Sequence, residues 1–83
     1  MTELEKFKNQ IRKIFAQRLK QARQEKKISQ RVLSDLTSIN RADIGLYETE
    51  RKFASFLNLL RIADALNVSL DWLCGRTDKM SGV

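Results

Sequence analysis

The chain of 83 residues is long enough for one small domain and too short for two. It has no histidine and one cysteine, which excludes an intrachain disulfide and an ordinary zinc site, and its three glycines lie too far apart for a phosphate-binding loop. A net charge of +6, from 16 basic and 10 acidic residues, favours a polyanionic partner. Since no nucleophile–base pair or metal set can be drawn, we expect no enzymatic activity, no cofactor and no metal.

The positive charge is concentrated at the N-terminal end. Residues 1–31 hold ten basic and three acidic side chains, a net of +7, whereas residues 32–83 carry a net of −1. No apolar run is long enough to span a membrane, and lysines and arginines interrupt the region where a signal peptide would have its apolar core. We therefore expect a cytoplasmic protein without a membrane partner, and a single free cysteine fits that reducing compartment.

A long helix is predicted for the N-terminal third. Thr2 and Glu5 have the spacing of a capping box, and apolar residues then recur at helical intervals, at Leu4, Phe7, Ile11, Ile14, Phe15, Leu19 and Ala22. The helix is expected to end near Lys26–Lys27 and to be about 35 Å long. Because that is long for so small a domain, we assign residues 1–17 to a helical extension. Its apolar stripe either packs back on the domain or contacts a second subunit.

Four shorter helices are predicted to follow, each after a residue suited to an N-cap, namely Ser29, Asn40, Ser55 and Ser69. Asn67 is a candidate left-handed residue at the end of the helix that begins after Ser55, and Gly75 is expected to stop the last helix. Only two to six residues separate the elements. The expected fold is all-α, a compact five-helix domain with a long first helix and a short tail at residues 78–83.

Residues 30–49 have the pattern of a helix-turn-helix. Two short helices are joined by the turn Thr37-Ser38-Ile39, which is too short for an antiparallel arrangement, so the helices must cross steeply. That geometry projects the second helix outward, where its N-terminal residues can enter the major groove of B-DNA.

Four stretches, RLKQAR (18–23), ISQ (28–30), IGLYE (44–48) and ALNVSLDWLCG (65–75), occur in the order and spacing of a known family. On these the chain resembles the lambda repressor/Cro-like, or XRE-type, helix-turn-helix regulators, from Arg18 to Thr77. The resemblance implies a DNA-binding domain over residues 18–77. It also implies an internal ion pair between Arg23 and Glu48, for which the planar guanidinium is well suited.

The resemblance implies that base edges are contacted by Gln30, Arg41, Ala42, Asp43 and Leu46, with the DNA backbone as the other interpretation of the Gln30 contact. Side chains near the two helix starts are the candidates for phosphate contacts, namely Arg18, Lys27, Arg31, Asn40, Arg51 and Lys52.

Several of these positions keep a second interpretation. Arg41 either bonds a guanine or is a solvated helix residue, and Leu46 either touches a thymine methyl group or packs at the edge of the core. Asp43 either accepts from a cytosine amino group or only favours the positive end of the helix dipole. Gly45 either lets a partner approach the backbone or is simply tolerated. Cys74 is expected to be a small buried apolar residue rather than a redox sensor.

The chain departs from the family pattern at several positions. Ser34 and Ser38 replace the usual alanine and turn glycine, and both are small enough for the tight crossing. Thr37 stands where an apolar residue is common, and Leu36 is expected to serve instead after a slight rotation. Phe53-Ala54 replaces a basic residue and proline, which is why Arg51 and Lys52 become the phosphate candidates of that loop.

The expected function is sequence-specific binding of double-stranded DNA by a transcriptional regulator, a repressor that acts as a homodimer on two half-sites about 34 Å apart. The dimer would use the C-terminal helix, through Leu70, Trp72 and Leu73, or the N-terminal stripe, with a place in the core as the other interpretation of Trp72 and Leu73. A phage or mobile-element repressor, a restriction–modification controller and an antitoxin all fit. The alternative is a protein-interaction module, or an antitoxin, that mainly binds a regulatory protein partner.

Overall fold

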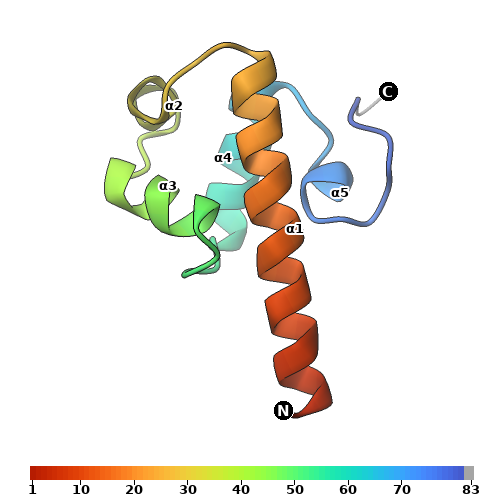
Figure 1. The fold of residues 1–83 in the computed structure, drawn as a ribbon. Helices are drawn as coiled ribbons and strands as arrows, with labels where there is room; N and C mark the ends of the chain where they lie inside the picture. Colours follow the sequence, from red (N-terminus) through yellow and green to blue (C-terminus); the bar gives the residue numbers. More distant parts are fainter. Residues whose placement is uncertain (82–83) are drawn as a thin grey trace.

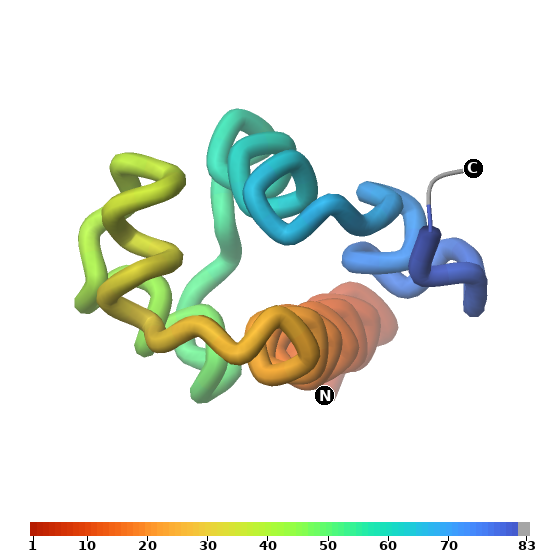
Figure 2. Tube along the Cα trace, turned by 90° about the horizontal axis from the view of Figure 1, so that it is seen from above, coloured from red at the N-terminus to blue at the C-terminus, as the bar shows by residue number. Residues whose placement is uncertain are grey.

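The computed structural model describes residues 1–81, which form five α-helices and no strand (Figure 1). The helices are α1 (Glu3–Glu25), α2 (Gln30–Thr37), α3 (Arg41–Glu48), α4 (Phe56–Leu66) and α5 (Leu70–Leu73). Seen along α1 in Figure 2, α2 and α3 lie on one side of it, α5 and the C-terminal segment lie on the other, and α4 lies between these groups. The all-α, five-helix fold with a long first helix is the one predicted from the sequence.

The helices begin where the sequence predicts. In each case the side-chain oxygen of the N-cap residue accepts a backbone N–H two or three residues later, at 2.8–3.2 Å, and these caps are Thr2, Ser29, Asn40, Ser55 and Ser69. Asn67 ends α4 in the left-handed conformation (φ 54°), as predicted, and Gly75 follows α5 with φ 83°. Ser38 ends α2 with φ 60°, a conformation that favours glycine.

The core is formed by one face of α1 and the inner faces of the other helices. Its buried apolar residues are Phe15, Leu19, Ala22, Leu33, Ile39, Ile44, Tyr47, Ile62, Ala63, Leu66, Trp72 and Leu73. The rings of Phe15 and Tyr47 pack at a tilt, with centroids 5.6 Å apart. Phe15 and Ala16 are buried, so the packed domain already includes residues that the sequence assigned to the extension.

The expectation that Leu36 replaces Thr37 in the core is wrong. Thr37 is buried, whereas Leu36 is 60% exposed. The threonine hydroxyl donates to the carbonyl of Leu33 at 2.7 Å and accepts the N–H of Ile39 at 3.3 Å. Because both bonds are local, the hydroxyl is satisfied inside the core, and α2 needs no rotation.

The C-terminal helix is part of the core of a single chain. Trp72 is 4% exposed and Leu73 is fully buried, while Leu70 is half-buried and packs against the same core. Trp72 and Leu73, enclosed in this way, offer almost no apolar surface to a second subunit. The dimer contact predicted for Trp72 and Leu73 is therefore wrong, and their other interpretation, a place in the core, is what the structure shows.

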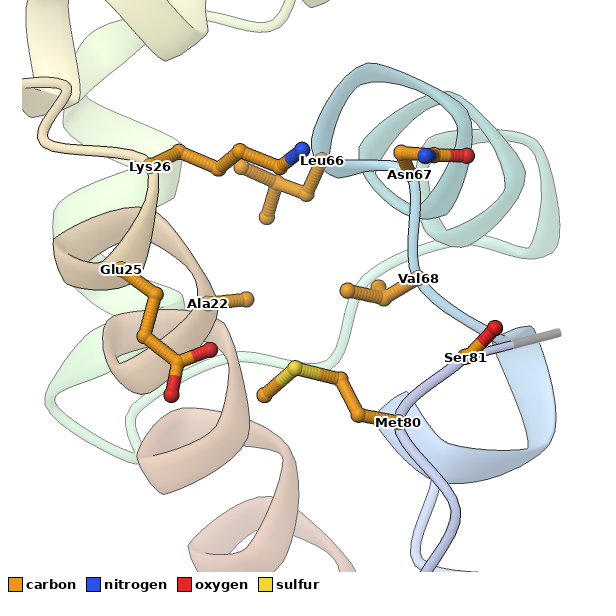
Figure 3. A pocket seen from close by; sticks show the side chains of 8 residues that line it. All are labelled: Ala22, Glu25, Lys26, Leu66, Asn67, Val68, Met80 and Ser81. Carbon is orange, nitrogen blue, oxygen red and sulfur yellow. The ribbon is translucent and has the colours of Figure 1, made fainter.

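The segment after α5 folds back on the domain. The N–H of Ser69 donates to the carbonyl of Met80 at 2.8 Å. Figure 3 shows the Met80 side chain reaching toward α1, in a pocket of about 450 Å³ that Ala22 and Val68 also line. The expected tail, residues 78–83, is thus packed as far as Met80, and its last two residues lie outside the described range. No helix of residues 1–81 is long and apolar enough to cross a membrane.

Candidate nucleic-acid interface

Helices α2 and α3 form a steeply crossed pair at one side of the molecule (Figures 1 and 2). The hydroxyl of Ser34 donates to the carbonyl of Ile39, which ties α2 to the turn that leads into α3. Ile44, Tyr47 and Glu48 form the buried face of α3. The first residues of α3 consequently lie on the surface, as a helix that enters a DNA groove requires.

Two of the predicted base-reading residues are exposed at this surface. Arg41 and Ala42 are exposed in the first turn of α3, and Asn40 caps that turn through a 2.8 Å bond to the N–H of Ala42. Leu46 is half-buried, which agrees with a position at the edge of the core. Arginine at the start of a groove-facing helix is the side chain best suited to bond the O6 and N7 atoms of guanine.

Gln30, at the start of α2, lies against α3. Its amide oxygen is 3.9 Å from the point that a Cβ atom of Gly45 would occupy, and its amide nitrogen donates to Glu48 at 3.1 Å. The bond to Glu48 orients the amide, and the glycine gives it room. The structure thus places Gln30 beside α3, the predicted recognition helix, where the sequence expects a DNA contact.

A buried ion pair fixes α3 relative to α1. The Nε and Nη2 atoms of Arg23 bond the two carboxylate oxygens of Glu48 at 2.8 and 2.9 Å, and Nη1 donates to the carbonyl of Ile28 at 2.9 Å. Glu48 is 3% exposed in its side chain and Arg23 is 15% exposed. The hydrogen bond to Glu48 raises the pKa of Arg23 and outweighs the opposing effect of burial. With Gln30, the pair links α1, α2 and α3 in one polar network.

Asp43 and Lys52, both predicted to contact DNA, bind each other. The Lys52 ammonium lies 2.9 Å from the Asp43 carboxylate, and the hydrogen bond raises the pKa of Lys52. The pair joins α3 to the loop that follows it and partly neutralises both charges. This role of Asp43 was in neither interpretation of the sequence, because no helical or strand periodicity relates the two positions.

Arg18 does not lie at the predicted interface. Its guanidinium donates to the carbonyls of Trp72 and Thr77, bonds the carboxylate of Asp78 at 3.2 Å and stacks 5.1 Å from the centre of the Trp72 ring. These groups belong to α5 and the C-terminal segment, on the opposite side of α1 from α2 and α3 (Figure 2). Arg18 therefore ties the C-terminal end to α1, and the phosphate contact expected for it is a wrong assignment.

The other phosphate candidates are exposed near the ends of α2 and α3. Lys27 lies in the loop before α2, Arg31 in the first turn of α2, and Arg51 in the loop after α3.

Cys74 is half-buried at the end of α5, and burial raises the pKa of its thiol, with a further contribution from Asp71. A protonated thiol of this kind is a poor nucleophile, which agrees with a structural role.

A crossed helix pair with an outward second helix and basic side chains at its ends defines a DNA-binding helix-turn-helix regulator. Comparison with known proteins leads to the same class. Residues 16–79 match the model of a helix-turn-helix domain family, and the chain belongs to that family.

The chain is 33% identical over 60 residues to the uncharacterized HTH-type transcriptional regulator YqaE of Bacillus subtilis (strain 168). That match covers 72% of this chain and 52% of the relative, so the chain spans about half of the relative's length. Among solved structures, the restriction-modification controller protein C.AhdI of Aeromonas hydrophila is similar, with a TM-score of 0.71 and 32% identity over 75% of this chain and 94% of that one. The resemblance to helix-turn-helix regulators predicted from the sequence is confirmed.

Proposed function

We propose that this protein is a sequence-specific regulator of transcription, a repressor, that binds two DNA half-sites as a homodimer. The proposal rests on the way in which α3 is exposed at one end and held in place at the other. Its first turn, with Arg41, faces outward, while the buried Arg23–Glu48 pair holds the helix from behind. Specific recognition requires a helix that is held in a fixed position, because a loosely held side chain cannot discriminate between base edges.

Affinity and base reading would come from different parts of the surface. The segment from Asn40 to Glu48 carries a net charge of −1, so it supplies little attraction to DNA by itself. Phosphate contacts would come from Lys27, Arg31 and Arg51, which are exposed around it. Arg41, with Gln30 and Leu46, would then select the sequence.

Repression is the simplest regulatory outcome for such a protein, since a dimer that occupies an operator excludes other proteins from the same DNA. Because one small domain reads only a short half-site, useful specificity requires two copies on two half-sites. The name of the similar controller protein suggests the control of restriction–modification genes as a setting for this activity. The protein would act in the cytoplasm, as its sequence suggests.

A salt series with random duplex DNA tests DNA binding itself. We expect binding at low salt and a steep linear fall of log K with log salt, because each phosphate contact releases counterions. The second candidate function, a module that binds a protein partner, is favoured by the Asp43–Lys52 pair, which neutralises a cation beside the recognition helix. Absence of binding to any duplex at low salt would overturn the DNA-binding proposal in favour of this candidate.

A further inference from the structure

The N-terminal turns of α1 lie outside the helix-turn-helix domain. The family model begins to match at residue 16, and α1 projects beyond the other helices at its N-terminal end (Figure 1). The similar controller protein is matched over 94% of its own length but over only 75% of this chain. The proposed roles of α2 and α3 in DNA binding therefore leave the turns of α1 that precede the buried Phe15 without a function.

This projecting part of α1 has an apolar face that the domain covers only at one end. Helical spacing places Leu4, Phe7, Ile11 and Ile14 on one face of α1. Ile14 packs tightly on Gly75, and Ile11 is half-buried, whereas Leu4 and Phe7 are 60% and 58% exposed. A cavity of about 420 Å³ continues this face between Phe7 and the end of α5. Apolar surface that is contiguous in this way is typical of a contact with another protein.

We propose that this face of α1 binds a second copy of the chain, with the two α1 helices antiparallel and crossing near Phe7 and Lys8. The proposal rests on the homodimer of the proposed function and assigns its interface. In this register Leu4 of each copy lies opposite Ile11 of the other, so that the exposed end of each face is covered by the half-buried end of its counterpart.

The charges along α1 favour this partner and this orientation. The first turn carries the acidic Glu3 and Glu5, whereas every charged residue from Lys6 to Arg23 is basic. An antiparallel pair brings the acidic first turn of each helix toward the basic turns of the other. A parallel pair would instead place Lys8 and Arg12 against the same residues of the second copy, which is unfavourable.

The position of α3 along α1 supplies an independent argument. Tyr47 packs on Phe15 and Glu48 binds Arg23, so the C-terminal end of α3 lies at the level of Leu19, midway between these contacts. From the crossing point to Leu19 is about 17 Å at 1.5 Å per residue, so the two-fold axis sets the C-terminal ends of the two α3 helices about 34 Å apart along the direction of α1. That is the separation of successive major grooves on one side of DNA, which a dimeric regulator must span.

Sedimentation equilibrium of the full chain without DNA, at about 1–100 µM, tests the interface directly. We expect the unmodified protein to be a dimer. Phe7→Glu and, separately, Leu4→Glu should weaken dimerisation by about 100-fold or more, because each places an unpaired charge in an apolar contact. The matched control is Phe56→Glu, which changes a side chain that is 69% exposed on α4 and should leave the dimer intact. Far-ultraviolet circular dichroism should show the same helix content in every variant.

A monomeric unmodified protein would overturn the proposal. The proposal would also be overturned if the Phe7→Glu variant and the Leu4→Glu variant are both folded and both remain dimeric. Loss of the dimer in Phe56→Glu, with Phe7→Glu unaffected, would place the interface on α4 instead. These outcomes are distinct from failure of the proposed DNA binding, because they are measured without DNA. If DNA binding holds, the monomeric variants should bind a single half-site as the parent does and should lose only the added affinity for two half-sites.

Discussion

Glu48, at the end of the recognition helix, is held by Arg23 of α1 through two hydrogen bonds of 2.8 and 2.9 Å, in a position where only 3% of its side chain is exposed. The same carboxylate accepts from Gln30 at the start of α2. One buried acid therefore sets the relative positions of all three helices on which DNA reading depends. The desolvation of both charges opposes their attraction, so the net stabilisation by the pair is smaller than its geometry alone would give.

We predict that Arg23→Ala lowers the free energy of unfolding by about 3–5 kcal/mol, because it leaves the Glu48 carboxylate buried without its cation. Urea unfolding followed by circular dichroism measures the loss. The double variant Arg23→Met/Glu48→Met should recover most of it, since it removes both charges together. Lys20→Ala, an exposed change on the same helix, is the control and should cost less than about 0.5 kcal/mol. A loss below about 1 kcal/mol for Arg23→Ala would contradict this account.

Replacement by alanine should have opposite effects on stability at Gly45 and at Gly75. Gly45→Ala should raise stability by about 0.5–1 kcal/mol, because it lies within α3 and its Cβ would meet only Gln30, at an ordinary 3.9 Å. Gly75→Ala should lower stability by more than about 1 kcal/mol, since φ is +83° and the Cβ would lie 2.8 Å from Ile14. Thermal unfolding measures both. Shifts in the same direction would count against these assignments, and a loss of DNA affinity in the more stable Gly45→Ala would show that DNA approaches the backbone there.

Asp43 should limit the contribution of Lys52 to DNA binding. Asp43→Asn removes the partner of Lys52 and one negative charge from the surface of α3. We therefore predict tighter binding to random duplex DNA at low salt, with a slope of log K against log salt that is steeper by about 0.9, the value for one more phosphate contact. The double variant Asp43→Asn/Lys52→Ala should lose the extra slope. An unchanged slope in Asp43→Asn would mean that Lys52 does not reach the DNA.

Arg41 and Lys27 should differ in the kind of binding that they support. Arg41→Ala is expected to cost about 1–3 kcal/mol on a selected site and little on random DNA, because a base contact is made only with the right sequence. Lys27→Ala is expected to weaken both equally and to lower the salt slope by about 1. Fluorescence anisotropy with the two duplexes provides the four affinities. An equal loss on both duplexes for Arg41→Ala would remove its assignment as a base reader.

Cys74 should react slowly with alkylating reagents. Burial raises the pKa of the thiol, so at neutral pH the fraction of reactive thiolate is smaller than for a free cysteine. Mass spectrometry of iodoacetamide labelling at pH 7.5 should give a lower rate for the folded chain than for the chain unfolded in urea. Since the effect is on the thiolate fraction, the folded rate should continue to rise with pH beyond the range in which the unfolded rate levels off. Equal rates in the two states would contradict the half-buried, protonated thiol.

The features that could be predicted from the sequence are those set by neighbouring residues. Ser29, Ser55 and Ser69 cap their helices because a cap needs only a side-chain oxygen and the next turn of backbone. The five helices and the exposed start of α3 follow from these caps and the spacing of apolar residues. The prediction that Leu36 replaces Thr37 in the core is wrong for a related reason. The expectation that buried positions are apolar does not consider a hydroxyl that forms hydrogen bonds within its own helix and the next turn.

The features that could not be predicted depend on residues far apart in the chain. Arg18 belongs to the same run of basic residues as Lys27. Its side chain nevertheless points away from the predicted interface, because it bonds the carbonyls of Trp72 and Thr77, which only the folded chain brings near it. The Asp43–Lys52 pair likewise depends on the path of the loop after α3. Nor does helical periodicity alone distinguish a core residue such as Trp72 from one that faces a second subunit, because both are apolar and both lie on one face.

Selection of the protein's binding sites from a library of random duplexes tests sequence-specific binding to two half-sites. We expect enrichment of one inverted repeat, with half-site centres about 10–10.5 base pairs apart or a multiple of that distance. Recovery of sequences with no common motif, from a protein that is folded and retained on the DNA, would contradict this expectation.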